Sequence, residues 1–234
     1  MSGTLYGIGV GPGDPELITL KAIKAIRSSD VICLPMSGDG EAMAYAIAVK
    51  ACPEVELIEK LEVSMPMSRD AALLDKMHGL AAQSIIEKLD EGKNVAFLTI
   101  GDPCLYSTYM YVHKRVAKAG YGAEIINGVA SFLAVCGRLG ISAAEASEPV
   151  IIIPASYEGA TNLISQPGTK VLMKTGRAIE AVKEAIAERG LENQTYAVSN
   201  CGLEGEKVYI GSQDLESNYF TVIIIKDDKE MASI

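Results

Sequence analysis

The stretch from Asn94 to Thr108, NVAFLTIGDPCLYST, organises the rest of the chain. Residues 95–100 form an uncharged apolar run of strand length, which is typical of a parallel strand covered on both faces. The run stops at Gly101, Asp102 and Pro103, where the glycine allows backbone to approach a ligand and the proline fixes the exit direction. Ligands of open α/β sheets bind beyond the carboxyl ends of the strands. Asp102 is therefore the first candidate for chemistry.

Helical periodicity follows this loop. The apolar positions Leu105, Tyr109, Val112, Val116 and Ala119 fall on one stripe of a helix. The unit is predicted to be strand, tight loop and helix.

Composition and charge restrict the class of protein. The 234 residues are 49% hydrophobic and 22% charged, which suits a folded globular chain of one large or two small domains. No apolar run approaches the roughly 20 residues of a membrane span, and the first residues lack a basic and apolar leader, so we expect a cytoplasmic protein. The formal charge of −9 argues against a nucleic-acid partner and favours a cationic ligand over a polyanionic one, unless a local basic cluster meets the latter.

The five cysteines are scattered and never form a CxxC pair. This pattern predicts reduced thiols rather than a disulfide framework or a zinc site. His78 and His113 lack a second ligand at metal spacing, so we interpret both as structural or surface residues and expect no metal.

Strands and helices alternate through the first part of the chain, and a mixed pattern follows. We expect strands at 4–10, 31–34, 55–58, 95–100, 124–126, 150–154, 170–173, 195–199, 207–210 and 221–226, and helices at 15–27, 41–51, 69–91, from 105 onward, up to 139 and at 178–189. The last three strands are joined by short connections and can be antiparallel. The fold class is therefore two α/β domains with a cleft between them. We expect residues 1–146 to form the domain with a mainly parallel sheet and residues 147–234 the domain with a mixed sheet.

Two loops leave alternatives open. Glycines at 7, 9, 11 and 13 suggest a dinucleotide site, but neither spacing completes G-x-G-x-x-G, and no phosphate-binding GxxxxGK[ST] occurs. The loop is then either a tight turn or a surface, with Pro12, that a flat ligand approaches. In the segment 65–70, Ser68 can cap the following helix and Asp70 suits its first turn, whereas Arg69 is either a solvated charge or a guanidinium for substrate carboxylates.

Five separated motifs resemble the tetrapyrrole methyltransferase family in order and spacing. They are GVGPGDPELITLKA at 9–22, GDPCLYST at 101–108, NGVASF at 127–132, VLMKTGR at 171–177 and SNCGLEGE at 199–206. Two departures are NGVAS, where many members have PGVSS, and SNCG, where many have ERCG. The likeness is strongest to the branch that methylates carbon 20 of the cobalamin precursor, cobalt-factor II or precorrin-2.

The resemblance implies S-adenosylmethionine as methyl donor, bound folded in the interdomain cleft largely by main-chain groups, and it implies a homodimer. Carried over by position, the expected lining is Pro12, Gly101, Asp102, Cys104, Tyr106, Ser131, Phe132, Lys174, Cys201 and Thr221. Asp102 is also the candidate catalytic residue, and three roles compete for it: cofactor binding, loop shaping, and removal of the proton after methyl transfer.

Other functions remain open at this point. One is methylation at another ring position, or the protein methylation that relatives perform in the diphthamide pathway. Another is a tetrapyrrole carrier or cofactor sensor without turnover. The residues do not reveal whether the substrate carries cobalt, and overall likeness favours the cobalt form.

Overall fold

The computed structural model describes residues 2–37 and 43–227, and it divides the chain into two compact units that meet between Ala130 and Ser131. Sequence analysis placed the boundary between residues 146 and 147. The structure puts it earlier because helix α5 (Ser131–Leu139) buries Val135 and Leu139 against the sheet of the second unit.

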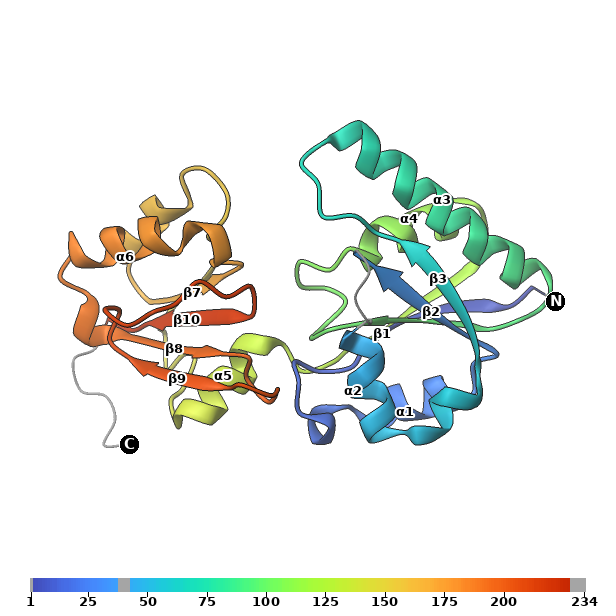
Figure 1. Cartoon of the computed structure of the whole chain (residues 1–234), viewed down its shortest axis with the longest axis horizontal. Coiled ribbons are helices and arrows are strands. Elements are labelled where there is room, and N and C mark those ends of the chain that lie inside the picture. The colour runs from blue at the N-terminus through green and yellow to red at the C-terminus, as the bar shows by residue number, and fades with distance from the viewer. Residues whose placement is uncertain (1, 38–42, 228–234) are drawn as a thin grey trace. The chain divides into compact units, whose positions relative to one another are not determined.

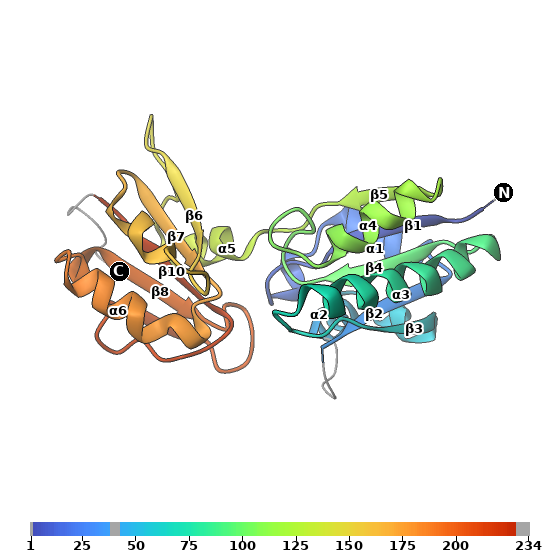
Figure 2. The same cartoon turned by 90° about the horizontal axis from the view of Figure 1, so that it is seen from above.

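Unit 1 is a five-stranded parallel sheet in the order β3-β2-β4-β1-β5, which Figure 2 shows from above. The strands are β1 (Thr4–Gly9), β2 (Val31–Met36), β3 (Glu59–Ser64), β4 (Val95–Thr99) and β5 (Gly122–Ile126). Helices α3 (Ala71–Asp90) and α4 (Tyr109–Lys118) cover one face, and α1 (Leu20–Arg27) and α2 (Met43–Ala51) cover the other (Figure 1). The expected strand 95–100 is thus a central strand covered on both faces.

A glycine in β1 makes room for the buried ring of Tyr109 in the core of unit 1. The ring is fully buried against Phe97, at 5.3 Å between ring centroids. A side chain on Gly7 would come within 2.0 Å of this ring, so glycine is required there. The Tyr109 hydroxyl lies 3.2 Å from the Glu124 carbonyl, to which it can donate, and 2.9 Å from Nδ1 of His113. His113 therefore has a structural role, as expected.

Unit 2 is a mixed sheet in the order β6-β7-β10-β8-β9. Its strands are β6 (Val150–Pro154), β7 (Thr169–Met173), β8 (Thr195–Ser199), β9 (Lys207–Ile210) and β10 (Thr221–Ile225). β6 pairs with β7 in parallel, and the other pairs are antiparallel, including β8 with β9 and β10 as expected. Helices α5 and α6 (Ile179–Ala187) cover opposite faces (Figure 1).

Two buried lysines of unit 2 are paired with carboxylates. Lys226 is 3% exposed and its ammonium donates to Glu148 at 2.7 Å, and the Thr169 hydroxyl donates to the same carboxylate at 2.8 Å. Lys170, 1% exposed, pairs with Asp227. The Glu148 contacts attach the segment before β6 to the start of β7 and the end of β10, and the Lys170–Asp227 pair joins β7 to the residues after β10.

Several expected elements differ from the structure. The strand expected at 55–58 is wrong: Pro53–Leu57 is a 3-10 helix, and the strand follows as β3. The helix expected from 105 begins at Tyr109, and the helix expected at 15–27 is a 3-10 turn, Pro15–Leu17, followed by α1. The start of the helix expected at 41–51 lies outside the described residues.

The entry to α3 also differs in detail. Asp70, rather than Ser68, is the N-cap, and its carboxylate accepts hydrogen bonds from the backbone N–H groups of Ala72 and Leu73. Ser68 accepts from the Asp70 N–H instead. Within the described residues no helix is long and apolar enough to cross a bilayer.

Candidate active site

Three glycines bring the loops beyond β1, β4 and β5 into backbone contact. A side chain on Gly9 would lie 2.5 Å from the Gly101 carbonyl oxygen and 2.7 Å from the Gly128 nitrogen. Gly101 also forms two backbone hydrogen bonds with Gly11, of 2.8 and 3.3 Å. We call Gly9, Gly101 and Gly128 the glycine junction. It lies at the carboxyl edge of the sheet, where α/β proteins bind ligands.

Hydrogen bonds to the Asp102 carboxylate stabilise this junction. One carboxylate oxygen accepts a hydrogen bond from the Cys104 N–H at 2.7 Å, and the other accepts from the Gly128 N–H and from the Asn127 side chain, both at 3.0 Å. The carboxylate therefore joins the loop after β4 to the loop after β5. This geometry gives Asp102 a loop-shaping role.

The other expected residues of unit 1 surround this loop. Pro12 and Gly101 are buried, whereas Cys104 and Tyr106 are exposed. Partial burial and then the neighbouring Asp102 charge raise the pKa of the Cys104 thiol, which keeps it protonated at neutral pH. Tyr106 has a positive φ of 51°, which is unfavourable for a bulky residue and marks a constrained loop.

The expected residues of unit 2 lie mostly at one edge of its sheet. Lys174 directly follows β7, Cys201 stands two residues after the end of β8, and Thr221 begins the antiparallel β10, so all three reach the same edge. The Thr221 hydroxyl lies 2.5 Å from that of Ser199. Burial lowers the pKa of the Lys174 ammonium. Ser131 and Phe132 begin α5, which is also in this unit.

The loop after β8, like the loop after β4, is stabilised by a carboxylate that accepts a backbone hydrogen bond. The Glu206 carboxylate accepts from the Gly202 N–H at 2.8 Å and pairs with Arg138 of α5 at 2.6 Å. The hydrogen bond from Gly202, and then Arg138, hold the pKa of Glu206 below its ordinary value. Cys201 is thereby held in a loop of fixed shape.

Thr175 is a feature that sequence reasoning missed. Its hydroxyl is fully buried and has no hydrogen-bond partner among the described residues. Buried polar groups are normally satisfied, so an orphaned one next to the expected site residue Lys174 points to a ligand. Lys174, at φ 57°, and Asn200, at φ 53°, add backbone strain at the same edge.

Sequence reasoning also missed Gly9 and Gly128 as parts of the junction and Asn127 as a partner of Asp102. All three fall in the motifs at 9–22 and 127–132 and near the carboxyl ends of expected strands, but no pattern in the sequence links them to Asp102 or Gly101. The structure brings the expected residues together within each unit: one group around the glycine junction, and one at the edge of the second sheet. His78 is buried and stacks on Tyr111, so it has a structural role.

The chain is similar in sequence to a known protein family and to several of its members. The family model for tetrapyrrole (corrin/porphyrin) methylases matches residues 4–215. A probable cobalt-precorrin-2 C(20)-methyltransferase of Methanocaldococcus jannaschii is 34% identical, over 95% of each chain. The cobalamin biosynthesis protein CobIJ of Mycobacterium tuberculosis is 29% identical over 98% of this chain, which spans 47% of CobIJ, about half of its length.

A solved structure shares the fold. Uroporphyrin-III C-methyltransferase of Thermus thermophilus, in complex with S-adenosylhomocysteine, matches with a TM-score of 0.69 and 20% identity, over 96% of this chain and 92% of that one. At this identity the likeness concerns the fold alone.

Proposed function

The chain belongs to the tetrapyrrole methylase family, and from that premise we propose that it transfers a methyl group from S-adenosylmethionine to carbon 20 of cobalt-factor II or precorrin-2 in cobalamin biosynthesis. The observation that carries this proposal is the match along nearly the whole of both chains with the Methanocaldococcus jannaschii relative, whose name specifies carbon 20. That name also includes cobalt, which favours the cobalt-loaded substrate.

The residues fit a cofactor held by main-chain groups. The glycine junction fixes the backbone of three strand-end loops at the carboxyl edge of the sheet of unit 1, and the orphaned Thr175 hydroxyl offers a buried hydrogen-bonding group. The proposed holding residues are Pro12, Gly101, Asp102, Cys104 and Tyr106 of unit 1 and Ser131, Phe132, Lys174, Cys201 and Thr221 of unit 2. The bound S-adenosylhomocysteine of the Thermus thermophilus relative supports this choice of cofactor.

In this reaction the protein's role is to align the methyl donor with the acceptor carbon. When bound, S-adenosylmethionine would supply an electrophilic methyl group to an electron-rich ring carbon, with the S–CH3 bond breaking and S-adenosylhomocysteine as the leaving group. No serine or cysteine nucleophile is then needed, and rigid positioning supplies much of the rate. The glycine junction and the Asp102 hydrogen bonds provide that rigidity in unit 1, and the Glu206 contacts provide it in the loop after β8.

The proton on the methylated carbon must leave after transfer, which requires a base or water. Both Asp102 oxygens already accept hydrogen bonds from the chain. We therefore assign Asp102 to loop shaping and cofactor binding rather than to proton removal.

We also propose that the protein is a homodimer in the cytoplasm, as the family resemblance suggests. The five cysteines, which are all free thiols, agree with a reducing compartment. Light scattering of the purified protein tests the dimer: the mass of a single chain would contradict it.

The proposed activity is tested with cobalt-loaded and metal-free precorrin-2, compared side by side without oxygen. Carbon-13 in the donor methyl group, followed by NMR of the product, identifies the methylated carbon. Label at carbon 20, and faster turnover of the cobalt form, are the expected results. Label at another position would redirect the assignment. Binding of S-adenosylhomocysteine with no methyl transfer to either tetrapyrrole would indicate a sensor or carrier.

A further inference from the structure

Arg69 has a distinctive place in unit 1. Among the described residues, it is the only lysine or arginine in the loops that follow the carboxyl ends of the five strands, namely 10–19, 37, 65–70, 100–108 and 127–130. The protein carries a net charge of −9, so a polycarboxylate ligand at this edge would meet little other positive charge there.

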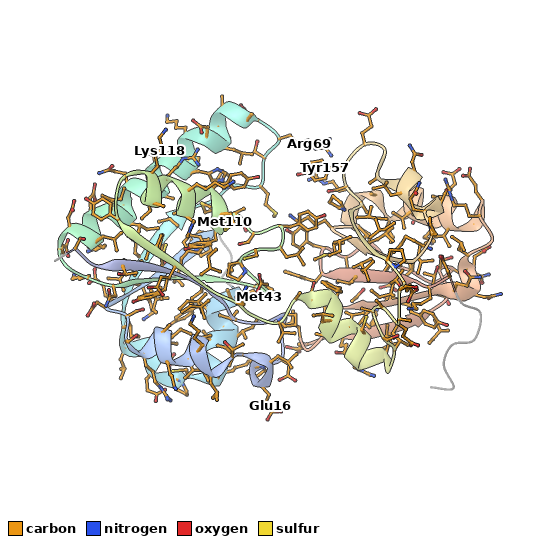
Figure 3. All side chains as sticks on the ribbon, turned by 180° about the vertical axis from the view of Figure 1, so that it is seen from behind. Glu16, Met43, Arg69, Met110, Lys118 and Tyr157 are labelled. Carbon is orange, nitrogen blue, oxygen red and sulfur yellow. The ribbon has the colours of Figure 1, made fainter. Side chains whose placement is uncertain are left out.

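The backbone around Arg69 is fixed while its side chain is exposed. The Asp70 N–H donates to the Ser68 hydroxyl at 3.0 Å, and the Asp70 carboxylate caps α3. The Met65 N–H donates to the Met36 carbonyl at 2.7 Å, which ties the start of the segment to the end of β2. The Arg69 guanidinium forms no ion pair or hydrogen bond with the residues that the structure describes, and Figure 3 shows it at the end of the segment leading into α3.

Methionines gather at this edge of unit 1. Of the nine methionines in the chain, five stand in unit 1 where a strand ends or a helix begins, and Figure 3 labels two of these, Met43 and Met110. The five are Met36, Met43, Met65, Met67 and Met110. Met67 is 73% exposed, two residues before Arg69. Methionine is flexible and polarisable, so it adapts to the surface of a large apolar ligand.

We propose that Arg69 binds a peripheral carboxylate of the tetrapyrrole substrate and that Met67 contacts its flat apolar face; this rests on the proposed function. A guanidinium can hold a carboxylate by two parallel hydrogen bonds, which fixes the rotation of a disc as well as its position. Arg69 would then help to decide which ring carbon faces the methyl donor. Its role is to orient the substrate, and it takes no part in the chemical step.

The test compares Arg69→Ala and Arg69→Lys with Lys118→Ala. Lys118 is exposed at the end of α4, away from the strand-end loops, and forms no ion pair with the described residues. For Arg69→Ala we expect the KM for cobalt-factor II to rise about tenfold, the scale of one charge-assisted hydrogen bond, while kcat stays within about threefold. Arg69→Lys should fall between, and Lys118→Ala should match the wild type.

Two further readouts separate binding of the substrate from binding of the cofactor. The Kd for S-adenosylhomocysteine, from calorimetry, should be unchanged in Arg69→Ala. The KM difference should shrink as salt is raised, because the lost contact is ionic. Met67→Gln, which keeps the length of the side chain, should raise the KM about threefold by removing apolar contact.

The outcomes are distinct. If the wild type methylates the tetrapyrrole and Arg69→Ala has the KM of Lys118→Ala, the inference is overturned and the proposed function stands. If the wild type binds S-adenosylhomocysteine but neither binds nor methylates a tetrapyrrole, both the proposed function and the role of Arg69 are overturned. A shift of the label to a different ring carbon in Arg69→Ala would support the orienting role.

Discussion

The carboxylate of Asp102 accepts a hydrogen bond from the backbone N–H of Gly128 at 3.0 Å, which joins two loops 26 residues apart in the sequence. Since the same carboxylate also accepts from Cys104 and Asn127, three donors converge on one side chain. Substitution of Asp102 should therefore mainly change the conformation of the loop after β4.

For Asp102→Asn we expect the affinity for S-adenosylhomocysteine to fall about tenfold, because an amide turns one of its ends into a donor that faces other donors. Single-turnover methyl transfer at saturating cofactor should stay within about threefold. Calorimetry and rapid-quench kinetics measure the two quantities. Unchanged binding with a rate loss of about a hundredfold would assign Asp102 to proton removal instead.

The second prediction separates backbone strain from close approach at Gly101. Gly101, at φ 70°, and Gly120, at φ 92°, both adopt a conformation that side chains disfavour, but a side chain at Gly120 would meet nothing within 4 Å. Alanine at either position should cost about 1 kcal/mol of stability or somewhat more. Only Gly101→Ala should also weaken S-adenosylhomocysteine binding, and Gly101→Val should do so by more than about tenfold. Equal binding by the Gly101 and Gly120 variants would place the cofactor elsewhere.

Thr175 permits a test in which stability and binding change in opposite directions. Thr175→Val removes a buried hydroxyl that has no partner among the described residues, so the free energy of unfolding without ligand should rise by about 1 kcal/mol. If the hydroxyl serves the cofactor, the Kd for S-adenosylhomocysteine should rise about fivefold or more.

Thr195→Val is the matched control for this experiment. Its hydroxyl is equally buried but donates to the Leu191 carbonyl at 2.9 Å, so this variant should lose stability and retain binding. Urea unfolding and calorimetry measure both variants. A Thr175→Val protein with normal affinity would show that the hydroxyl is not used by the cofactor.

The fourth prediction concerns the buried pair of Glu148 and Lys226. Glu148→Gln leaves the Lys226 ammonium, 4% exposed at its side chain, without its carboxylate, and should destabilise unit 2 by about 3–5 kcal/mol. Glu216→Gln breaks a pair with Lys207 in which both side chains are more than half exposed, and should cost at most about 1 kcal/mol. Similar losses in the two variants, measured by urea unfolding, would contradict the buried role.

The same pair has a pH signature. Burial opposes the ionisation of Glu148, but the hydrogen bonds from Lys226 and Thr169 outweigh it and hold the pKa of Glu148 below its ordinary value of 4.5. A lowered pKa in the folded state stabilises the protein above the unfolded value, and this stabilisation is lost as the pH falls through the lowered pKa. Wild type should therefore lose stability on acidification below about pH 4.5 more steeply than Glu148→Gln. Parallel curves for the two proteins would rule out this contribution.

The sequence predicted the elements that carry a strong local pattern. β4 and the Gly-Asp-Pro loop were recognised because an uncharged apolar run ends at turn residues. The strand expected at 55–58 was wrong because β3, EKLEVS, is an edge strand with exposed polar residues and lacks the apolar run that marks a covered strand.

The candidate site was predictable only in part, because its contacts are not local. Asp102 was singled out from its position, yet its partners Asn127 and Gly128 come from another strand-end loop, and no spacing rule connects them. The orphaned hydroxyl of Thr175 depends on what surrounds it, which a sequence pattern does not contain. The family resemblance supplied the list of lining residues, and the structure shows how the chain holds several of them.

The glycine junction also bears on how such a protein can change over time. Because Gly9 and Gly128 each leave no room for a side chain against Gly101, a substitution at one of them cannot be accommodated unless the backbone of another moves. The three glycines of the junction are therefore expected to be retained together in evolution. Residues on the surrounding loops, such as Met67 and Arg69, are exposed and can vary singly. New substrate preferences can thus arise at the rim of the site while the centre stays fixed.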